Sequence, residues 1–517
     1  MLAKLREWLG LRGAGAVAGE EHLTDLRNAQ RFARQHGQDV RYCYALRTWL
    51  TWTGARWTRD AGAEVMTRAK ATVRTLYAEA AAHPDAVGRS ALAGWARKSE
   101  HEARLRALLF LAQSEPGIPV AVERLDADLY LLNLKNGTLD LRTGRLQPNS
   151  RRDLLTRLVP VEYDPAARCP LWEAFLARIF AGNARVIQFI QRAIGYSLTG
   201  ATVEQVFFLL WGSGANGKTT LLKTIFALLG DYAVSTRAET FMVKGPDAIP
   251  NDVARLRSGR YVLAVKADSG QRLAEALVKQ ATGGDVMTAR FMRAEFFDFV
   301  PTFKLFLATN HKPIIRGTDL AMWRRVRLIP FTVTIPPAEQ DRHLEARLRQ
   351  EWPGILRWVV EGCLGWQREG LGLPDEVRVA TARYRAEMDA LGDFIREKCV
   401  VDPEAEETPA ELYRAYREWA EAAGERAMSR HALGRRLEER GFQPGRTGRK
   451  GRFWSGVRLR TPTDSEPDGD ASPAVTHWDA FFSSDTPNAR AVGISGEKRH
   501  QASPPPEASP DQEVVEL

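Results

Sequence analysis

A glycine-rich segment, residues 211–220, carries the side chains with the clearest chemical potential in this sequence. Its spacing is G-x-x-x-x-G-K-T, between an apolar run at 206–210 and a stretch of helical spacing at 221–226. Glycines between a strand and a helix let backbone N–H groups close around a phosphate chain, where the helix dipole favours negative charge. We therefore predict a nucleoside triphosphate site in this loop. The residues assigned to it are Gly212, Ser213, Gly214, Ala215, Asn216, Gly217, Lys218, Thr219 and Thr220.

Two side chains of this loop have individual roles in the predicted site. Lys218 is expected to reach the β- and γ-phosphates of ATP with its ammonium group. The Thr219 hydroxyl is the expected protein ligand of Mg²⁺. ATP and Mg²⁺ are therefore the cofactors that the sequence predicts.

Two further apolar runs, residues 259–265 and 303–310, indicate buried strands. Strands that alternate with helices after a phosphate loop form a parallel sheet, with the ligand at the carboxyl ends of the strands. We therefore predict an α/β fold for this region. Asn310 ends the second run, so its amide is placed to orient an attacking water near the γ-phosphate.

Arginines follow at positions 324, 325 and 327. One interpretation of these three arginines is a solvated surface. In an oligomeric ATPase, one of them could instead act on the γ-phosphate of the neighbouring subunit. The sequence leaves both interpretations open.

Residues 283–285 are a Gly-Gly-Asp turn signal, and the alternating residues at 288–296 predict a hairpin that carries Arg290 and Arg293. Basic side chains with an aromatic residue between them suit contact with a nucleic-acid backbone. Surface arginines in salt bridges are the alternative.

The region from 408 to 460 predicts a small unit with two helices and a basic hairpin, the parts of a winged helix-turn-helix. Its first helix has Thr408 as N-cap, Pro409 at the first helical position and Glu411 to complete a capping box. Between residues 425 and 460, eleven Lys and Arg face three Asp and Glu, a local net charge of +8. This charge favours DNA contact over a merely basic surface. The DNA-binding residues assigned here are Arg435, Arg436, Arg446, Arg449, Lys450 and Arg452.

The N-terminal part predicts mixed α/β structure with little obvious chemistry. Residues 49–58 predict a hairpin whose three tryptophans form either its small core or a base-stacking surface. Residues 131–141 predict a second hairpin with Asn136-Gly137 as a type I′ turn. Asp126 and Asp128 are the nearest approach to a paired-carboxylate metal site, and a solvated loop is the preferred interpretation.

Composition bounds the remaining possibilities. The chain has 517 residues, a hydrophobic content of 44% and a net charge of +9. Its four cysteines are scattered, and it has neither a long apolar run nor a signal peptide, so we expect a cytoplasmic protein without membrane contact. After residue 461, Pro, Ser, Asp, Glu and Ala dominate, which predicts a disordered acidic tail.

Taken in order, the motifs at 212–219, 279–285, 303–313 and 317–325 resemble those of superfamily 3 helicases. More narrowly, residues from about 20 to 460 resemble the phage and plasmid primase-helicase family, which is related to the poxvirus helicase-primase. The resemblance implies a homohexameric AAA+-like ring that hydrolyses ATP and translocates on single-stranded DNA in replication initiation. It also implies a sensor role for Asn310 and a finger role for Arg324 or Arg325. Arg290 and Arg293 would lie on or near the pore hairpin, and Lys279, which belongs to the same motif, is also assigned to DNA binding.

Two departures from the family pattern matter. Longer members carry a polymerising primase domain ahead of this region, and no such domain fits before residue 20, so primer synthesis by this chain alone is not expected. After the strand at 261–265 the family usually presents a Ser-Glu pair, whereas here the residues are Val265 and Lys266. Asp268 is the candidate substitute as catalytic acid and metal ligand, with Glu275 more distant.

We therefore predict an ATP-dependent DNA helicase of a bacterial host cytoplasm, with single-stranded DNA, origin duplex DNA and replication proteins as partners. The alternative is an ATP-binding scaffold or mixed-ring subunit with impaired hydrolysis. The assigned catalytic residues are Lys218, Asp268, Asn310, Arg324 and Arg325. The predicted divisions are a leader at 1–20, a mixed α/β domain at 21–199, an ATPase domain at 200–340, a helical segment at 341–400, a winged helix at 401–460 and a tail at 461–517.

Overall fold

The computed structural model describes residues 23–244, 251–265, 270–290, 295–317, 320–423, 427–447, 451–461 and 464. Lys266, Asp268, Arg293, Arg449 and Lys450 lie outside these residues, as do the predicted leader and nearly all of the predicted tail. None of the described helices is both long and apolar enough to cross a membrane.

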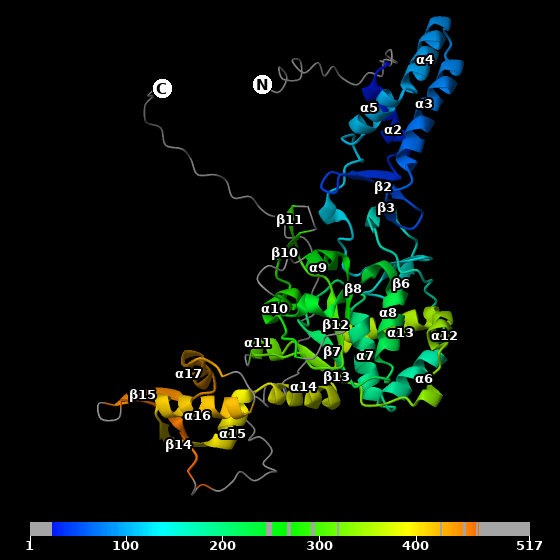
Figure 1. Cartoon of the computed structure of the whole chain (residues 1–517). Helices are drawn as coiled ribbons and strands as arrows, with labels where there is room; N and C mark the ends of the chain where they lie inside the picture. Colours follow the sequence, from blue (N-terminus) through cyan, green and yellow to red (C-terminus); the bar gives the residue numbers. More distant parts are fainter. Residues whose placement is uncertain are drawn as a thin grey trace, which may run out of the picture. The chain divides into compact units, whose positions relative to one another are not determined.

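The N-terminal part consists of helices and a small antiparallel sheet (Figure 1). Its elements are α2 (Asp25–His36), β1 (Val40–Cys43), β2 (Thr48–Trp52), β3 (Trp57–Arg59), α3 (Glu64–Ala82), α4 (Ala86–Ser99) and α5 (Glu102–Ala112). The predicted tryptophan hairpin is β2 and β3, to which β1 adds a third strand. Trp52 and Trp57 are buried against each other, with ring centroids 5.7 Å apart. These two rings therefore form a small core and are not a base-stacking surface.

The second hairpin forms with a different turn from the predicted one. It joins β4 (Leu131–Leu134) to β5 (Gly137–Asp140), and β6 (Arg145–Gln147) extends the sheet. Leu134 pairs with Gly137, so Lys135 and Asn136 form the turn, and neither has the positive φ of a type I′ turn. Gly137 instead starts a strand, where a Cβ would lie 2.5 Å from the carbonyl oxygen of Gln147.

The centre of the fold is a five-stranded parallel sheet in the order β13-β7-β12-β9-β8. Its strands are β7 (Phe207–Trp211), β8 (Ala233–Arg237), β9 (Tyr261–Val265), β12 (Lys304–Thr309) and β13 (Val326–Pro330). The α/β class and the three predicted strands of the parallel sheet are confirmed. Strands β8 and β13 were not predicted.

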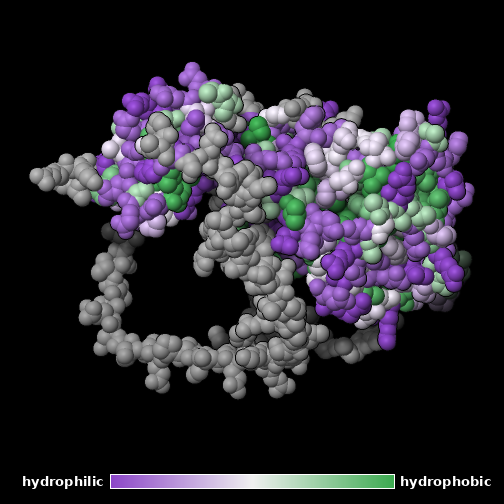
Figure 2. Space-filling view, turned by 90° about the horizontal axis from the view of Figure 1, so that it is seen from below, coloured by the Kyte–Doolittle hydropathy of each residue, from purple (hydrophilic) through white to green (hydrophobic). Residues whose placement is uncertain are grey.

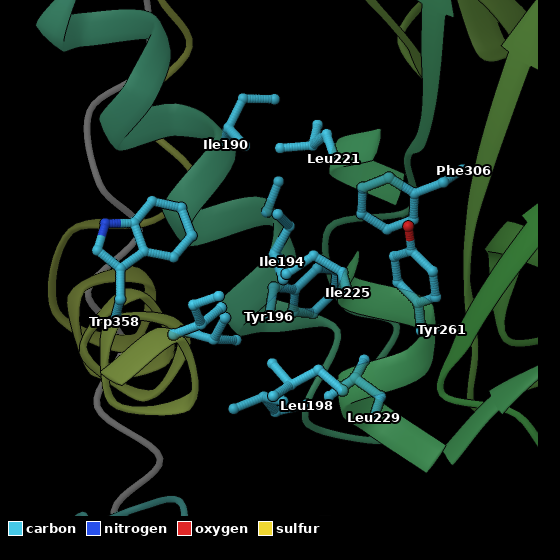
Figure 3. Packing of buried hydrophobic residues seen from close by; sticks show 14 of the residues in the cluster. Ile190, Ile194, Tyr196, Leu198, Leu221, Ile225, Leu229, Tyr261, Phe306 and Trp358 are labelled. Atoms are coloured by element: carbon cyan, nitrogen blue, oxygen red, sulfur yellow. The ribbon is translucent and has the colours of Figure 1, made fainter. Parts of the chain in front are cut away.

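Side chains of the sheet alternate between two hydrophobic clusters, as strand geometry requires. Phe208, Tyr261 and Phe306 face one cluster, which also contains residues of α7 (Ala184–Tyr196), α8 (Lys218–Leu229) and α13 (Trp352–Glu369). Figure 3 shows Tyr261 and Phe306 beside Leu221 and Ile225 of α8. The adjacent strand residues face a second cluster. Because both faces of the sheet are covered, the inner strands β7, β12 and β9 are almost entirely buried, whereas the edge strand β8 is partly exposed.

Helices cover the two faces of the sheet, and a short hairpin extends from the second face. On the first face lie α6 (Pro170–Ile179) and α12 (Leu344–Gln350) in addition to those named above. The second face carries α9 (Asn251–Ala254), α10 (Glu275–Gly283), α11 (Leu320–Trp323) and α14 (Asp375–Glu387), with β10 (Met287–Arg290) and β11 (Phe296–Phe299).

Glycines bring α7 and α13 into backbone contact. A Cβ at Gly195 would lie 2.1 Å from the amide nitrogen of Cys363, and one at Gly362 would lie 2.2 Å from the carbonyl oxygen of Gln191. Only glycine permits such an approach, because any side chain would overlap the facing main chain. The core cluster therefore continues from residues before the sheet to residues after it, across the predicted divisions at 199 and 340.

The C-terminal unit has a hydrophobic cluster of its own. It contains α15 (Ala390–Lys398), β14 (Cys399–Glu407), α16 (Pro409–Ala422), α17 (Arg430–Glu439), β15 (Gln443–Thr447) and β16 (Gly451–Leu459). Thr408 caps α16 as predicted and accepts a hydrogen bond from the Glu411 amide at 3.2 Å. The reciprocal bond comes from Glu407, since the Thr408 amide donates to Glu407 Oε1, so Glu411 does not complete a capping box. Most described residues on the face in Figure 2 are hydrophilic, with hydrophobic side chains in small groups.

Candidate nucleotide and nucleic-acid sites

The glycine-rich loop joins β7 to α8 and has an unusual backbone. Gly214 and Gly217 have φ values of 121° and 77°, and Ala215 has φ 47°. These left-handed conformations turn the chain sharply at the carboxyl end of the sheet. A Cβ at Gly212 would lie 2.4 Å from Asn216 Nδ2, so the loop closes tightly on itself.

Lys218 is the first residue of α8 and is buried, with 5% of its surface exposed. Its ammonium group donates to the carbonyl oxygens of Gly212 at 3.0 Å and Thr309 at 2.9 Å, and to Asn310 Oδ1 at 3.1 Å. All three acceptors are neutral. Burial lowers the pKa of Lys218 from its ordinary value to about 8. The loop thus holds a positive charge that gains from an anionic partner.

A second group of the loop has an unmet hydrogen-bonding need. Asn216 is buried, and within the described residues its Nδ2 has no hydrogen-bond partner. Its Oδ1 accepts from the Lys218 amide at 3.4 Å. A donor of this kind is costly to leave unpaired, and a phosphate oxygen is a suitable acceptor.

The hydroxyl-bearing residues of the glycine-rich loop are accessible to solvent. Ser213 and Thr219 are exposed, and Thr220 is partly buried. Among the described residues there is no cluster of three or more His, Cys, Asp and Glu side chains that could hold a metal ion. Asp268, the predicted second Mg²⁺ ligand, lies outside the described residues, so Thr219 is the described candidate.

Asn310 follows β12 and therefore lies beside the glycine-rich loop, at the same edge of the sheet. Two side chains that were not predicted from the sequence, those of Trp211 and Lys312, lie beside it. The Trp211 indole N–H donates to the Asn310 carbonyl oxygen at 3.1 Å. The Lys312 ammonium lies 4.5 Å from the Trp211 ring centroid and pairs with Glu387 at 2.6 Å. A tryptophan directly before the glycine-rich loop was the available signal.

The two candidate finger arginines have different environments. Arg325 is 8% exposed, and its Nε donates to Thr282 Oγ1 at 3.1 Å. Arg324 is exposed, and its Nη2 contacts Gln205 Oε1 at 2.6 Å. Both precede β13, and the Arg325 carbonyl oxygen accepts from the amide of Phe207, the first residue of β7. They therefore lie at the amino edge of the sheet, opposite Lys218.

The predicted hairpin is present as antiparallel β10 and β11. Arg290 pairs with Phe296, and its guanidinium lies 4.9 Å from the centroid of that ring. Phe296 is 61% exposed. Lys279 lies on α10, and Arg293 lies outside the described residues. The structure thus presents an exposed aromatic ring and a cation at the tip of the described hairpin.

The predicted DNA-binding residues of the C-terminal unit separate into two groups. Arg435, Arg446 and Arg452 line one groove between α17 and the hairpin of β15 and β16. Arg436 points elsewhere and donates to the main-chain carbonyl of Arg316. Arg449 and Lys450 lie outside the described residues.

Asp126 and Asp128 hold loops together and do not form a paired-carboxylate site. Asp126 accepts hydrogen bonds from the amide and hydroxyl of Thr156 and keeps only 10% of its side chain exposed. Asp128 pairs with Arg142 at 2.9 Å. The expectation of a solvated loop is therefore wrong for Asp126, whose carboxylate is mostly covered by its partners.

Comparison with known proteins adds family information to this geometry. Residues 29–181 match a family model described as D5 N terminal like. A protein named as a helicase in Acanthamoeba polyphaga mimivirus is 26% identical over 327 residues, covering 58% of this chain and 34% of the relative. One named as a helicase in Frog virus 3 is 27% identical over 310 residues, covering 55% and 30%. One named as a primase in African swine fever virus is 25% identical over 333 residues, covering 58% and 34%.

The chain thus spans about a third of the length of the curated relatives it matches, with 34% of the mimivirus protein covered. Among solved structures, the apo C terminal region of NrS-1 (305-718) aligns with a TM-score of 0.44 and 9% identity. The alignment covers 85% of this chain and 100% of that chain. A TM-score of this size does not establish a common fold.

Proposed function

Because this chain belongs to the primase-helicase family, as its D5-type segment and its viral relatives indicate, we propose that it is an ATP-dependent DNA helicase of the superfamily 3 type. In this proposal, residues around the parallel sheet form an AAA+-like ATPase and the C-terminal unit is a winged helix. Each part is supported by the geometry of described residues.

The environment of Lys218 is the observation that carries the proposal. Within the described residues, a buried ammonium group with only neutral acceptors lies beside a buried amide donor that has no partner, in a loop that follows a parallel strand. Phosphate oxygens would satisfy both groups. The donor set therefore fits ATP, with Lys218 and Asn216 as its phosphate contacts and Thr219 as the Mg²⁺ ligand.

Bound ATP would supply the free energy of phosphoryl transfer to water. The protein groups would position the phosphates and the attacking water, and would stabilise the charge that develops in the transition state. Lys218 places positive charge where negative charge develops. Asn310 lies within hydrogen-bonding distance of Lys218, so its amide is suitably placed to orient a water molecule at the same position. Trp211 holds the main chain of Asn310 and keeps this amide in place.

The position of Arg324 supports a ring of identical subunits. Strand β7 separates the amino edge of the sheet, where Arg324 lies, from the glycine-rich loop. Four residue steps along a strand measure roughly 13 Å, so Arg324 does not reach the nucleotide of its own subunit. An exposed arginine at that edge suits the γ-phosphate of a neighbour. Arg325, which is buried and bonded within the chain, suits a role in holding this edge together.

DNA would then contact two basic features. The hairpin of β10 and β11 presents Arg290 and Phe296, which suits a single strand passing through the ring. The C-terminal unit presents the arginines of α17 and of its own hairpin. Single-stranded DNA is accordingly the proposed substrate.

ATP hydrolysis tests the proposal when it is measured with and without single-stranded DNA. We expect DNA-stimulated turnover and unwinding of a forked duplex by the wild-type chain. Lys218→Ala should abolish both, and Arg324→Ala should lower turnover by about 10³-fold or more. An equal mixture of these two variants should recover part of the activity, because Lys218 of one subunit can meet Arg324 of the next.

If the mixture recovers no activity, the proposal that Lys218 of one subunit and Arg324 of the next act on the same ATP is refuted. ATP binding without turnover would refute the helicase proposal for this chain and favour a hydrolysis-impaired scaffold. In that case a gain of turnover in Lys266→Glu would assign the defect to the missing acid. In an active wild type, by contrast, a loss of turnover in Asp268→Ala would show that Asp268 supplies this acid.

A further inference from the structure

The C-terminal unit contains a groove of about 990 Å³ whose two walls are both basic. One wall is helix α17, on which Arg430 and Arg435 both line the groove. The other wall is the hairpin of β15 and β16, with Arg446 and Arg452. Glu438 is the only carboxylate among the described lining residues.

The hairpin wall holds two like charges directly opposite each other. Arg446 and Arg452 are cross-strand partners in the antiparallel ladder, and both are exposed. Like charges in this position destabilise a hairpin. Within the described residues neither arginine forms an ion pair, and neither does Arg430 across the groove, whereas Arg435 lies 3.8 Å from Glu439 on its own helix. Opposed arginines that cost stability and have no counter-ion among the described residues are explained by an external anion between the walls.

An aromatic ring borders the same groove. The Phe453 ring lies over Gly445, where a Cβ would come within 2.3 Å of it. Within the described residues, Phe453 is not part of the hydrophobic cluster of its unit. A ring fixed on the backbone of a glycine and left outside the core is available for stacking.

The shape of the groove discriminates between kinds of nucleic acid. A helix that reads duplex DNA must project into the major groove, which is about 12 Å wide. Here the hairpin lies against the arginine-bearing face of α17, so that face is one wall of a groove and does not project. A basic groove with an aromatic border is the arrangement that holds one unpaired strand.

We propose that this groove binds single-stranded nucleic acid, with Arg430, Arg435, Arg446 and Arg452 on the phosphates and Phe453 under a base. The proposal rests on the proposed function for the kind of ligand, and it replaces the duplex-reading role expected of a winged helix. Arg430 and Phe453 are additions to the residues assigned from sequence.

Binding of a fluorescent oligothymidine of about 16 nucleotides to the full chain, measured by anisotropy without ATP, tests the proposal. Arg446→Ala/Arg452→Ala should reduce the slope of log affinity against log salt by about 1.4, since each lost phosphate contact removes about 0.7. Phe453→Ala should weaken binding at least about fivefold, and Phe453→Trp should restore it. Affinity for a duplex of the same length should fall less than affinity for the single strand in these variants.

Three comparisons make the result specific. Arg396→Ala/Arg414→Ala removes two exposed arginines outside the groove and should leave the salt slope unchanged. The groove variants should unfold at the same temperature as the wild type or higher, because they relieve repulsion. The measurement is repeated in the Arg290→Ala chain, so that DNA held by β10 and β11 does not mask the groove.

Equal losses for duplex and single strand would overturn the proposal in favour of duplex reading. Unchanged binding by folded groove variants would exclude the groove as a nucleic-acid site. Binding of polyglutamate with the same dependence on Arg446 and Arg452 would assign it to an acidic protein. Because no ATP is present, a chain that lacks hydrolysis still gives a result, so the failure of this proposal and of the helicase proposal are distinguishable.

Discussion

Raising the pH above 8 should weaken nucleotide binding through the deprotonation of Lys218. Burial lowers the pKa of this residue to about 8 in the nucleotide-free protein. Only the ammonium form offers a positive charge to a phosphate chain. Since the protonated fraction falls tenfold for each pH unit above the pKa, the Kd should rise about 30-fold between pH 7 and pH 9.5.

Titration of a fluorescent ADP analogue across this pH range measures the effect. Lys218→Arg is the matched control, because a guanidinium stays charged throughout. The variant should bind with a Kd that does not change with pH, even if that Kd is higher than the wild-type value. An equal pH dependence in the two proteins would refute the assignment of Lys218 as the phosphate contact.

The same group predicts the pH dependence of stability. The unfolded chain keeps the Lys218 proton up to the ordinary pKa of 10.5, whereas the folded chain releases it at about 8. The unfolded state therefore binds more protons between these values, and the free energy of unfolding rises by about 1.4 kcal/mol per pH unit in that window. Lys218→Arg should lack this rise in the free energy of unfolding between pH 8 and 10.5, because its guanidinium stays charged. Saturating nucleotide should remove the difference between the two proteins, because a bound phosphate keeps Lys218 charged.

Three further tests, two of them with a matched control substitution, concern the structure itself. Arg325→Ala should cost about 2 kcal/mol in urea unfolding, because buried hydrogen bonds to Thr282 and Ala321 are lost, whereas Arg324→Ala should cost little; equal costs would contradict their different burial. Thr408→Ala should cost about 1 kcal/mol in thermal unfolding through loss of the α16 cap, and Thr408→Ser should not. Gly195→Ala should cost about 3 kcal/mol by forcing α7 away from α13, and a neutral outcome would refute their backbone contact.

Local sequence signals predicted the features that depend on neighbouring residues. The glycine-rich loop, the Thr408 cap and the strand that ends at Thr309 each follow from a few consecutive side chains. The turn after Leu134 shows the limit of such signals. Asn136-Gly137 has the composition of a type I′ turn, but the turn is formed by Lys135 and Asn136. Gly137 is the first residue after the turn, where the carbonyl oxygen of Gln147 on a third strand leaves no room for a side chain.

Features that depend on distant residues were not predictable. Arg324 and Arg325 are equivalent in sequence, and the partner that buries Arg325 is Thr282 on another helix. Likewise, the sequence of the C-terminal unit gives only the number of its arginines and their net charge. Only the packing of the hairpin against α17 shows which of them share a groove.

The glycine contact between α7 and α13 has a practical consequence for dissecting the chain. A fragment cut near residue 200, where sequence motifs place the start of the ATPase, would lose α7 and leave Phe208 and Phe306 without the layer that covers them. Such a fragment would present a broad apolar face and aggregate. Expression trials should therefore begin before β4 and extend beyond α14, so that the whole shared core is translated as one piece.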